Sequence, residues 1–147
     1  MTVIAWDGKT LAADKRATCV GNPNTTTKIR RLSDGTLIGA SGDADAAREI
    51  IYWYENGALP SNFPGNRDDS NNTRASILII TPERKIRMIQ RTAFLVDFED
   101  KFFAMGSGRD YALAAMHLGF DAIKAVEVAS ALDVDCGNGI DTLSLHV

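Results

Sequence analysis

The sequence is poor in the residues that build metal sites and disulfide frameworks. Its 147 residues include two cysteines and two histidines. Cys19 and Cys136 have neither the paired spacing nor the histidine neighbours of a zinc site, so we expect no metal and no cofactor. A structural disulfide between them is not expected in a reducing compartment.

The sequence also lacks long apolar runs and an excess of positive charge. No stretch is long enough to span a bilayer, and no basic segment followed by an apolar run begins the chain. The net charge is −3, the pI is near 5.3, and the basic run at 28–31 is short. We therefore expect a cytoplasmic protein that binds neither nucleic acid nor membranes.

What remains is the composition of one compact domain spanning 1–147. Of these residues 45% are hydrophobic, and a chain of this length buries about two-thirds of its unfolded surface. Two hairpins are predicted in the first third, because the turn dipeptides Asp7-Gly8 and Asp34-Gly35 each separate two apolar runs. Their strands cover 2–6 with 9–14, and 28–32 with 36–41.

Helices and strands alternate in blocks over the rest of the chain. A helix is predicted over 43–56, with Asp43 as its N-cap and Gly57 beyond its end. The polar, proline-containing stretch 59–74 is predicted to be a loop. Further strands are expected at 75–81, 85–91, 101–105 and 140–147, and further helices at 107–118 and 121–132, with Ser107 and Asp121 as candidate N-caps.

Five short motifs occur in a fixed order along the chain. They are TVIAW at 2–6, LAADKRAT at 11–18, KIRRL at 28–32, GASGDADA at 39–46 and MGSGRDYA at 105–112. Together they resemble the motifs of the proteasome β-subunits and, more closely, those of the HslV-type peptidases. The chain would be a short bacterial or phage-like variant of this family. Both groups are N-terminal-nucleophile (Ntn) hydrolases, so the resemblance implies an α+β fold, the four-layer αββα sandwich.

The resemblance also implies a threonine peptidase whose nucleophile is Thr2. Once Met1 is removed, Thr2 carries both a hydroxyl nucleophile and a free α-amino group. That amine has an ordinary pKa of roughly 7.7–8.0, which suits a base near neutral pH. The expected reaction is hydrolysis of a polypeptide through an acyl-enzyme.

Two charged residues match the family's acidic residue and lysine. The positive charge of Lys28 would stabilise the alkoxide and lower the pKa of the amine, and Asp14 would hold Lys28 in place. Considered without the motif, Lys28 would be a solvated strand-edge lysine and Asp14 a turn residue. The Ala-Ala-Asp context favours the functional interpretation.

Further residues complete the implied site. Gly42 matches the glycine whose N–H points at the oxyanion. Ser107 matches a serine that hydrogen-bonds near the nucleophile, although a helix N-cap is an equally good interpretation. Asp133 matches the family's aspartate, whereas Cys136 stands where the family has a serine, and a thiol is the weaker hydrogen-bond partner. Thr18 and Ala40 match substrate-lining positions, and the small Ala40 suggests a roomy pocket.

Other interpretations of the C-terminal residues are weaker. A cluster of Asp133, Asp135 and Asp141 suits a divalent cation, but solvation at a loop and strand end explains it equally simply. The stretch 137–139 lacks the lysine of a phosphate-binding loop and is assigned to a turn. A catalytic thiol at Cys136 is disfavoured, because neither histidine has a spacing that marks it as a partner.

The assembly and the activity leave alternatives open. The resembling proteins form homo-oligomeric rings, and their first helix pair faces partner rings or an ATPase unfoldase. Here the second helix of that pair is replaced by the polar loop, so an unfoldase partner is implied less firmly than the fold. A catalytically silent ring or scaffold subunit, and an Ntn amidase acting on a small amide, are the alternative functions.

Overall fold

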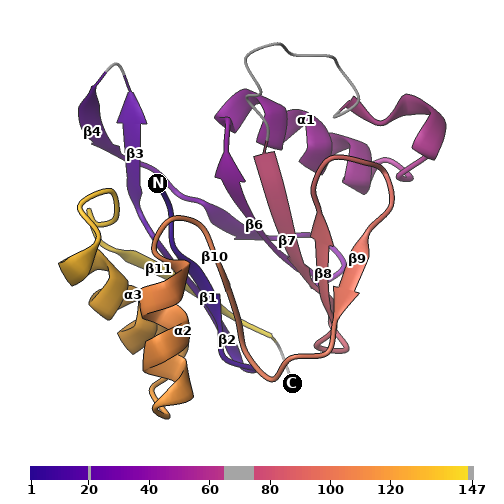
Figure 1. Ribbon diagram of the computed structural model, residues 1–147. Coiled ribbons are helices and arrows are strands. Elements are labelled where there is room, and N and C mark those ends of the chain that lie inside the picture. The colour runs from indigo at the N-terminus through magenta and orange to yellow at the C-terminus, as the bar shows by residue number, and fades with distance from the viewer. Residues whose placement is uncertain (20, 65–74, 146–147) are drawn as a thin grey trace.

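Two antiparallel sheets stack face to face, with helices on their outer faces (Figure 1). The computed structural model describes residues 1–19, 21–64 and 75–145. Helices α2 (Arg109–His117) and α3 (Ala122–Leu132) cover one sheet, and α1 (Ala44–Glu55) covers the other. This is the four-layer αββα sandwich that the resemblance implied.

The first sheet carries the N-terminus of the chain. Its strands lie in the order β10 (Phe103–Met105), β1 (Ile4–Trp6), β2 (Thr10–Asp14) and β11 (Ile140–Ser144). The predicted turn between β1 and β2 is present, and the Asp7 carboxylate accepts hydrogen bonds from the backbone of Lys9 and Thr10. Because β2 lies between β1 and β11, Asp14 at its end lies beside Val3, which precedes β1, and opposite Ile140 at the start of β11.

The second sheet has five strands in sequence order. They are β5 (Ile29–Arg31), β6 (Leu37–Gly42), β7 (Ala75–Ile80), β8 (Ile86–Ile89) and β9 (Val96–Phe98). A separate two-stranded ribbon is formed by β3 (Arg16–Cys19) and β4 (Asn22–Thr25). The sequence did not predict β3, β4 or β9, because they are short and β4 is polar and fully exposed.

The predicted N-cap residue is correct for two of the three helices. Asp43 accepts a hydrogen bond from Asp45 N, and Asp121 accepts one from Lys124 N, each at 2.9 Å. At α2 the candidate N-cap Ser107 is wrong, since Gly108 occupies that position and no side chain caps the helix. The Ser107 hydroxyl bonds to Thr2 instead.

Part of the predicted loop at 59–74 has regular structure. A 3-10 turn, η1 (Pro60–Asn62), packs on α1, where the Trp53 indole donates to Leu59 O (2.8 Å) and Asn62 Oδ1 (3.0 Å). The buried Phe63 ring meets Trp53 edge-on. Residues 65–74 lie outside the described part of the chain.

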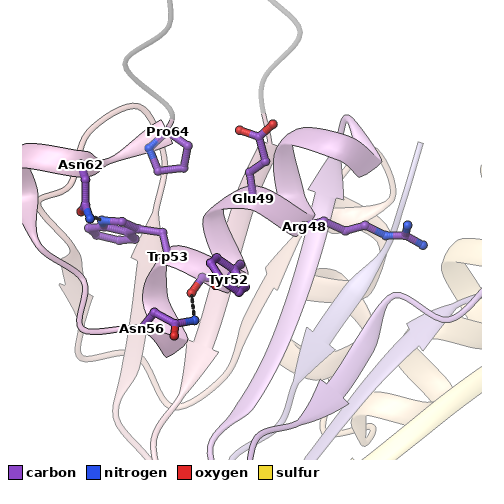
Figure 2. A pocket seen from close by; sticks show the side chains of 7 residues that line it. All are labelled: Arg48, Glu49, Tyr52, Trp53, Asn56, Asn62 and Pro64. Carbon is purple, nitrogen blue, oxygen red and sulfur yellow. Dashed lines mark hydrogen bonds between the residues drawn. The ribbon is translucent and has the colours of Figure 1, made fainter.

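Figure 2 shows the open pocket beside this turn, about 470 Å³ in volume. It is lined by Arg48, Glu49, Tyr52 and Trp53 of α1, and by Asn56, Asn62 and Pro64. In the described residues, α1 and η1 are the helical cover of the second sheet, so the family's long second helix is not seen there.

The apolar residues separate into three layers that match the fold. The layer between the sheets contains Trp6, Leu11 and Leu78, all at most 1% exposed. Two outer layers lie under α2 and α3 and under α1. None of the described helices is long and apolar enough to cross a membrane.

Candidate active site

Thr2 lies two residues before the start of β1 and is only 6% exposed. Its carbonyl accepts a hydrogen bond from Gly108 N at 3.1 Å, and its nitrogen donates to Ser107 Oγ at 3.2 Å. Gly106 packs directly on this carbonyl: its φ is +97°, and a Cβ there would lie 2.1 Å from Thr2 O. The segment 106–108 therefore holds the backbone of Thr2, and glycine is required at 106.

Lys28 brings a positive charge to the Thr2 hydroxyl. Its ammonium lies 3.2 Å from Thr2 Oγ1, 2.8 Å from Asp14 Oδ1 and 3.2 Å from the carbonyl oxygen of Met1. The Lys28 side chain is 7% exposed and that of Asp14 is fully buried. Water therefore screens this charge little, and the charge acts strongly on the oxygen beside it.

Asp14 is fixed by four donors. Oδ1 accepts from Val3 N (3.0 Å) and from Lys28, and Oδ2 accepts from Arg16 N (3.3 Å) and Gly137 N (3.1 Å). These bonds satisfy a carboxylate that has no access to water. They also hold its orientation, and through it the position of the Lys28 ammonium.

A second polar chain runs from Ser107 away from Thr2. Ser107 Oγ lies 3.9 Å from Cys136 Sγ, and the Cys136 thiol lies 3.4 Å from Asp133 Oδ2, to which it donates. The pKa of Asp133 is lowered, chiefly by the backbone N–H of Asp135 and further by the Ser107 hydroxyl and the Cys136 thiol. Cys136 thus occupies the geometric place of a hydroxyl between Ser107 and Asp133.

The surroundings of Cys136 favour the protonated form of its thiol. Burial, followed by the negative charge of Asp14, raises its pKa to about 11. A thiolate is the reactive form of cysteine, so this environment opposes nucleophilic use of Cys136. It agrees with the thiol's place as a donor to Asp133.

Gly42, Ala40 and Thr18 lie outside this hydrogen-bonded group. Ala40 N donates to Lys28 O at 3.1 Å, which places β6 beside the lysine, and Gly42 ends the same strand. Thr18 is exposed on β3, opposite Pro23.

Sequence reasoning missed the glycine contacts and Arg16. Gly106 and Gly108 flank Ser107 in a motif that was recognised, but their contacts with Thr2 depend on the packing of two distant segments. Gly137 was matched to the family's glycine after Cys136 and assigned to a turn, but its hydrogen bond to Asp14 was not predicted. No local pattern marks either role.

The acidic residues near the C-terminus do not gather into a metal site in the described structure. Asp141 pairs with Lys15 at 3.3 Å, and Asp133 faces Cys136.

The chain is similar to known proteins both in sequence and in fold. No family model matches the chain. The ATP-dependent protease subunit HslV of Geobacillus sp. strain WCH70 is 30% identical over 150 residues, covering 87% of this chain and 82% of that protein. The chain belongs to the HslV family. This family lies among the proteasome-like Ntn hydrolases, which are threonine peptidases.

Solved structures show the same fold as this HslV family member. HslV of Trypanosoma brucei superposes with a TM-score of 0.75 at 23% identity, covering 99% of both chains. The protein BPH of Thiobacillus denitrificans, in complex with epoxomicin, gives 0.68 at 23% identity over the full length of both chains. The fold class inferred from the sequence is therefore confirmed.

The protonation state of Cys136 yields a test. At pH 8 a thiol with a pKa of about 11 is ionised in about one molecule in a thousand, whereas an ordinary thiol is ionised in about one in four. In a Cys19→Ser background, we expect iodoacetamide to alkylate Cys136 at least about 100-fold more slowly in the folded protein than in urea. The rate should rise as the pH approaches 11. Alkylation at the unfolded rate at pH 8 would contradict the assignment.

Proposed function

We propose that this protein is a threonine peptidase, which hydrolyses peptide bonds through an acyl-enzyme on Thr2 after removal of Met1. The observation that carries the proposal is the Lys28 ammonium 3.2 Å from Thr2 Oγ1, paired with the buried Asp14. A buried cation aimed at a threonine hydroxyl has a direct chemical use, because it stabilises the oxygen as it loses its proton.

Removal of Met1 supplies the base. With Met1 attached, the nitrogen of Thr2 is an amide that donates to Ser107 and cannot accept a proton. Once it is a free amine, it takes the proton of Oγ1 as the hydroxyl attacks the substrate carbonyl. The same proton then passes to the leaving amine as the peptide bond breaks, and an ester of Thr2 remains. The amine next activates the water that hydrolyses this ester.

The remaining predicted residues take supporting roles. Asp14 keeps Lys28 in position, and Ser107 accepts a hydrogen bond from the Thr2 nitrogen. We assign the oxyanion donor to Gly42 N and the lining of the substrate site to Thr18 and Ala40, on their match to the family's motifs. Asp133 and Cys136 extend the polar chain behind Ser107.

We further propose that residues 1–147 form a single domain. Several copies of this domain would assemble into a closed homo-oligomeric ring in the cytoplasm. The relative from Geobacillus is named as a subunit of an ATP-dependent protease, which supports both assembly and an ATPase partner. Leu118 (76% exposed) and Phe120 (51% exposed), between α2 and α3, also place large apolar side chains close together on the described surface, and contiguous apolar surface is often covered in an assembly.

The nucleophile can be tested directly. Thr2→Ala in Met1-free protein should keep the fold and abolish both peptide turnover and labelling by a threonine-directed electrophile, because the hydroxyl is lost. Intact mass of the parent should show a chain without Met1. Undiminished activity in a protein that fully retains Met1 would contradict the mechanism. An inactive ring whose chains retain Met1 would favour the alternative of a catalytically silent subunit. Cleavage of small amides but not peptides would favour the amidase.

The charge on Lys28 gives a second test. Lys28→Met keeps the length of the side chain but removes the ammonium, so single-turnover acylation by a fluorogenic peptide should fall on the order of 10²–10⁴-fold. Lys28→Arg should not fully rescue it, because the planar guanidinium cannot place a point charge at the same spot.

The matched control for this test is Lys15→Met. Lys15 is adjacent to Asp14 in sequence, but it pairs with Asp141 and is 26% exposed. Thermal unfolding is measured on every variant, since Lys28→Met leaves the buried Asp14 without its charge partner and should lower stability. Acylation by folded Lys28→Met at the parental rate would remove Lys28 from the mechanism.

The ring is tested by light scattering. We expect a single species whose mass is an integral multiple of the 15.9 kDa chain and stays constant on dilution. A monomer at all concentrations would exclude the ring and would leave an exposed Thr2 site.

A further inference from the structure

The segment 133–138, between α3 and β11, contributes to the site at three points without forming a helix or strand. Asp133 and Cys136 continue the polar chain from Ser107, and Gly137 N donates to Asp14 Oδ2 at 3.1 Å. Gly137 is 123 positions from Asp14 in sequence. The site therefore depends on a contact that holds this segment against the end of β2.

Arg16 bonds to both ends of the segment. Its Nη1 donates to Val134 O at 2.6 Å, and its Nε donates to Asn138 Oδ1 at 3.0 Å. A guanidinium presents these donors in a fixed planar fork, so the two bonds fix the separation of the two acceptors. Asn138 is anchored in turn to β4, through Thr25 Oγ1 at 3.1 Å.

Between these two bonds the guanidinium lies against the backbone of Gly137. A Cβ at Gly137 would lie 2.7 Å from Arg16 Nη2 and 3.0 Å from Cζ, and the φ of this glycine is +153°. A side chain at position 137 would therefore displace the Arg16 guanidinium, and the positive φ also favours glycine there. The backbone N–H groups of Arg16 and Gly137 donate to the same oxygen, Asp14 Oδ2.

We propose that Arg16 is a positioning residue, which clamps 133–138 so that Gly137 N reaches Asp14 and the Cys136 thiol reaches Asp133. Its influence on Thr2 passes through two contacts. One is the orientation of Asp14, which holds Lys28, and the other is the link from Cys136 to Ser107. The consequence for acylation rests on the proposed function, whereas the hold on the segment does not.

The test uses Cys136 as a reporter of the segment, in Met1-free protein with Cys19→Ser. Arg16→Ala removes two charge-assisted hydrogen bonds, so Cys136 alkylation in the folded protein should become at least about tenfold faster. Single-turnover acylation should fall by at least about tenfold in the same variant. The control is Arg87→Ala, which removes another strand arginine that donates from Nε, here to Asp97 at 2.7 Å. It should leave both rates at the parental value.

Arg16→Lys is the gentler second variant. A single ammonium cannot reproduce both donor directions, so both rates should lie between those of the parent and Arg16→Ala. Thermal unfolding identifies the temperature range in which every variant is folded. If Arg16→Ala and Arg16→Lys only lower the melting temperature, with both rates parental in that range, the proposal is overturned.

The two readouts also separate this inference from the proposed function. Faster alkylation with unchanged acylation would show that the clamp has no part in catalysis, and would overturn the positioning role. If the parent protein with Arg16 intact fails to acylate, the proposed peptidase function is contradicted. The ratio of the Cys136 alkylation rates of Arg16→Ala and the parent would still decide whether Arg16 holds the segment.

Discussion

The buried ion pair between Asp14 and Lys28 is the interaction on which the rest of the site depends. A carboxylate with no exposed surface is tolerable only when every lone pair has a donor, and Asp14 receives one ammonium and three backbone N–H groups. Those donors come from the N-terminal segment, β3, the residue before β5 and the segment before β11. Satisfying one charge therefore brings together four parts of the chain, and it leaves the ammonium beside Thr2 Oγ1.

The polar chain behind Ser107 shows how one substitution is accommodated. Cys136 replaces the serine of the family pattern, yet its thiol still lies between Ser107 and Asp133. Burial raises its pKa to about 11, so the sulfur stays protonated and remains a donor to Asp133. The hydrogen bonds of a thiol are longer and weaker than those of a hydroxyl, and in our proposal Arg16 is a second interaction that holds the segment in place.

The two helical layers differ in construction. On one side α2 and α3 pack together on the first sheet and bury the small residues Ala112, Ala125 and Ala129. On the other side α1 is accompanied in the described structure by the short turn η1, which is secured by Trp53. The hydrogen-bonded residues of the site come from the N-terminus, the end of β2, the residue before β5 and the segments 106–108 and 133–138, and neither α1 nor η1 contributes one of them.

Local chemistry determined what the sequence alone could predict. Asp-Gly turns, aspartate caps and apolar runs act over a few residues, so the two hairpins and the starts of α1 and α3 were predicted correctly. The ordered motifs gave the family, and with it the fold and the candidate residues Thr2, Asp14 and Lys28.

The tertiary structure decided the rest. Whether Ser107 caps α2 or bonds to Thr2 depends on which partner lies nearer after folding. The Gly137 and Arg16 contacts join segments more than 100 residues apart, and no spacing in the sequence encodes such a distance.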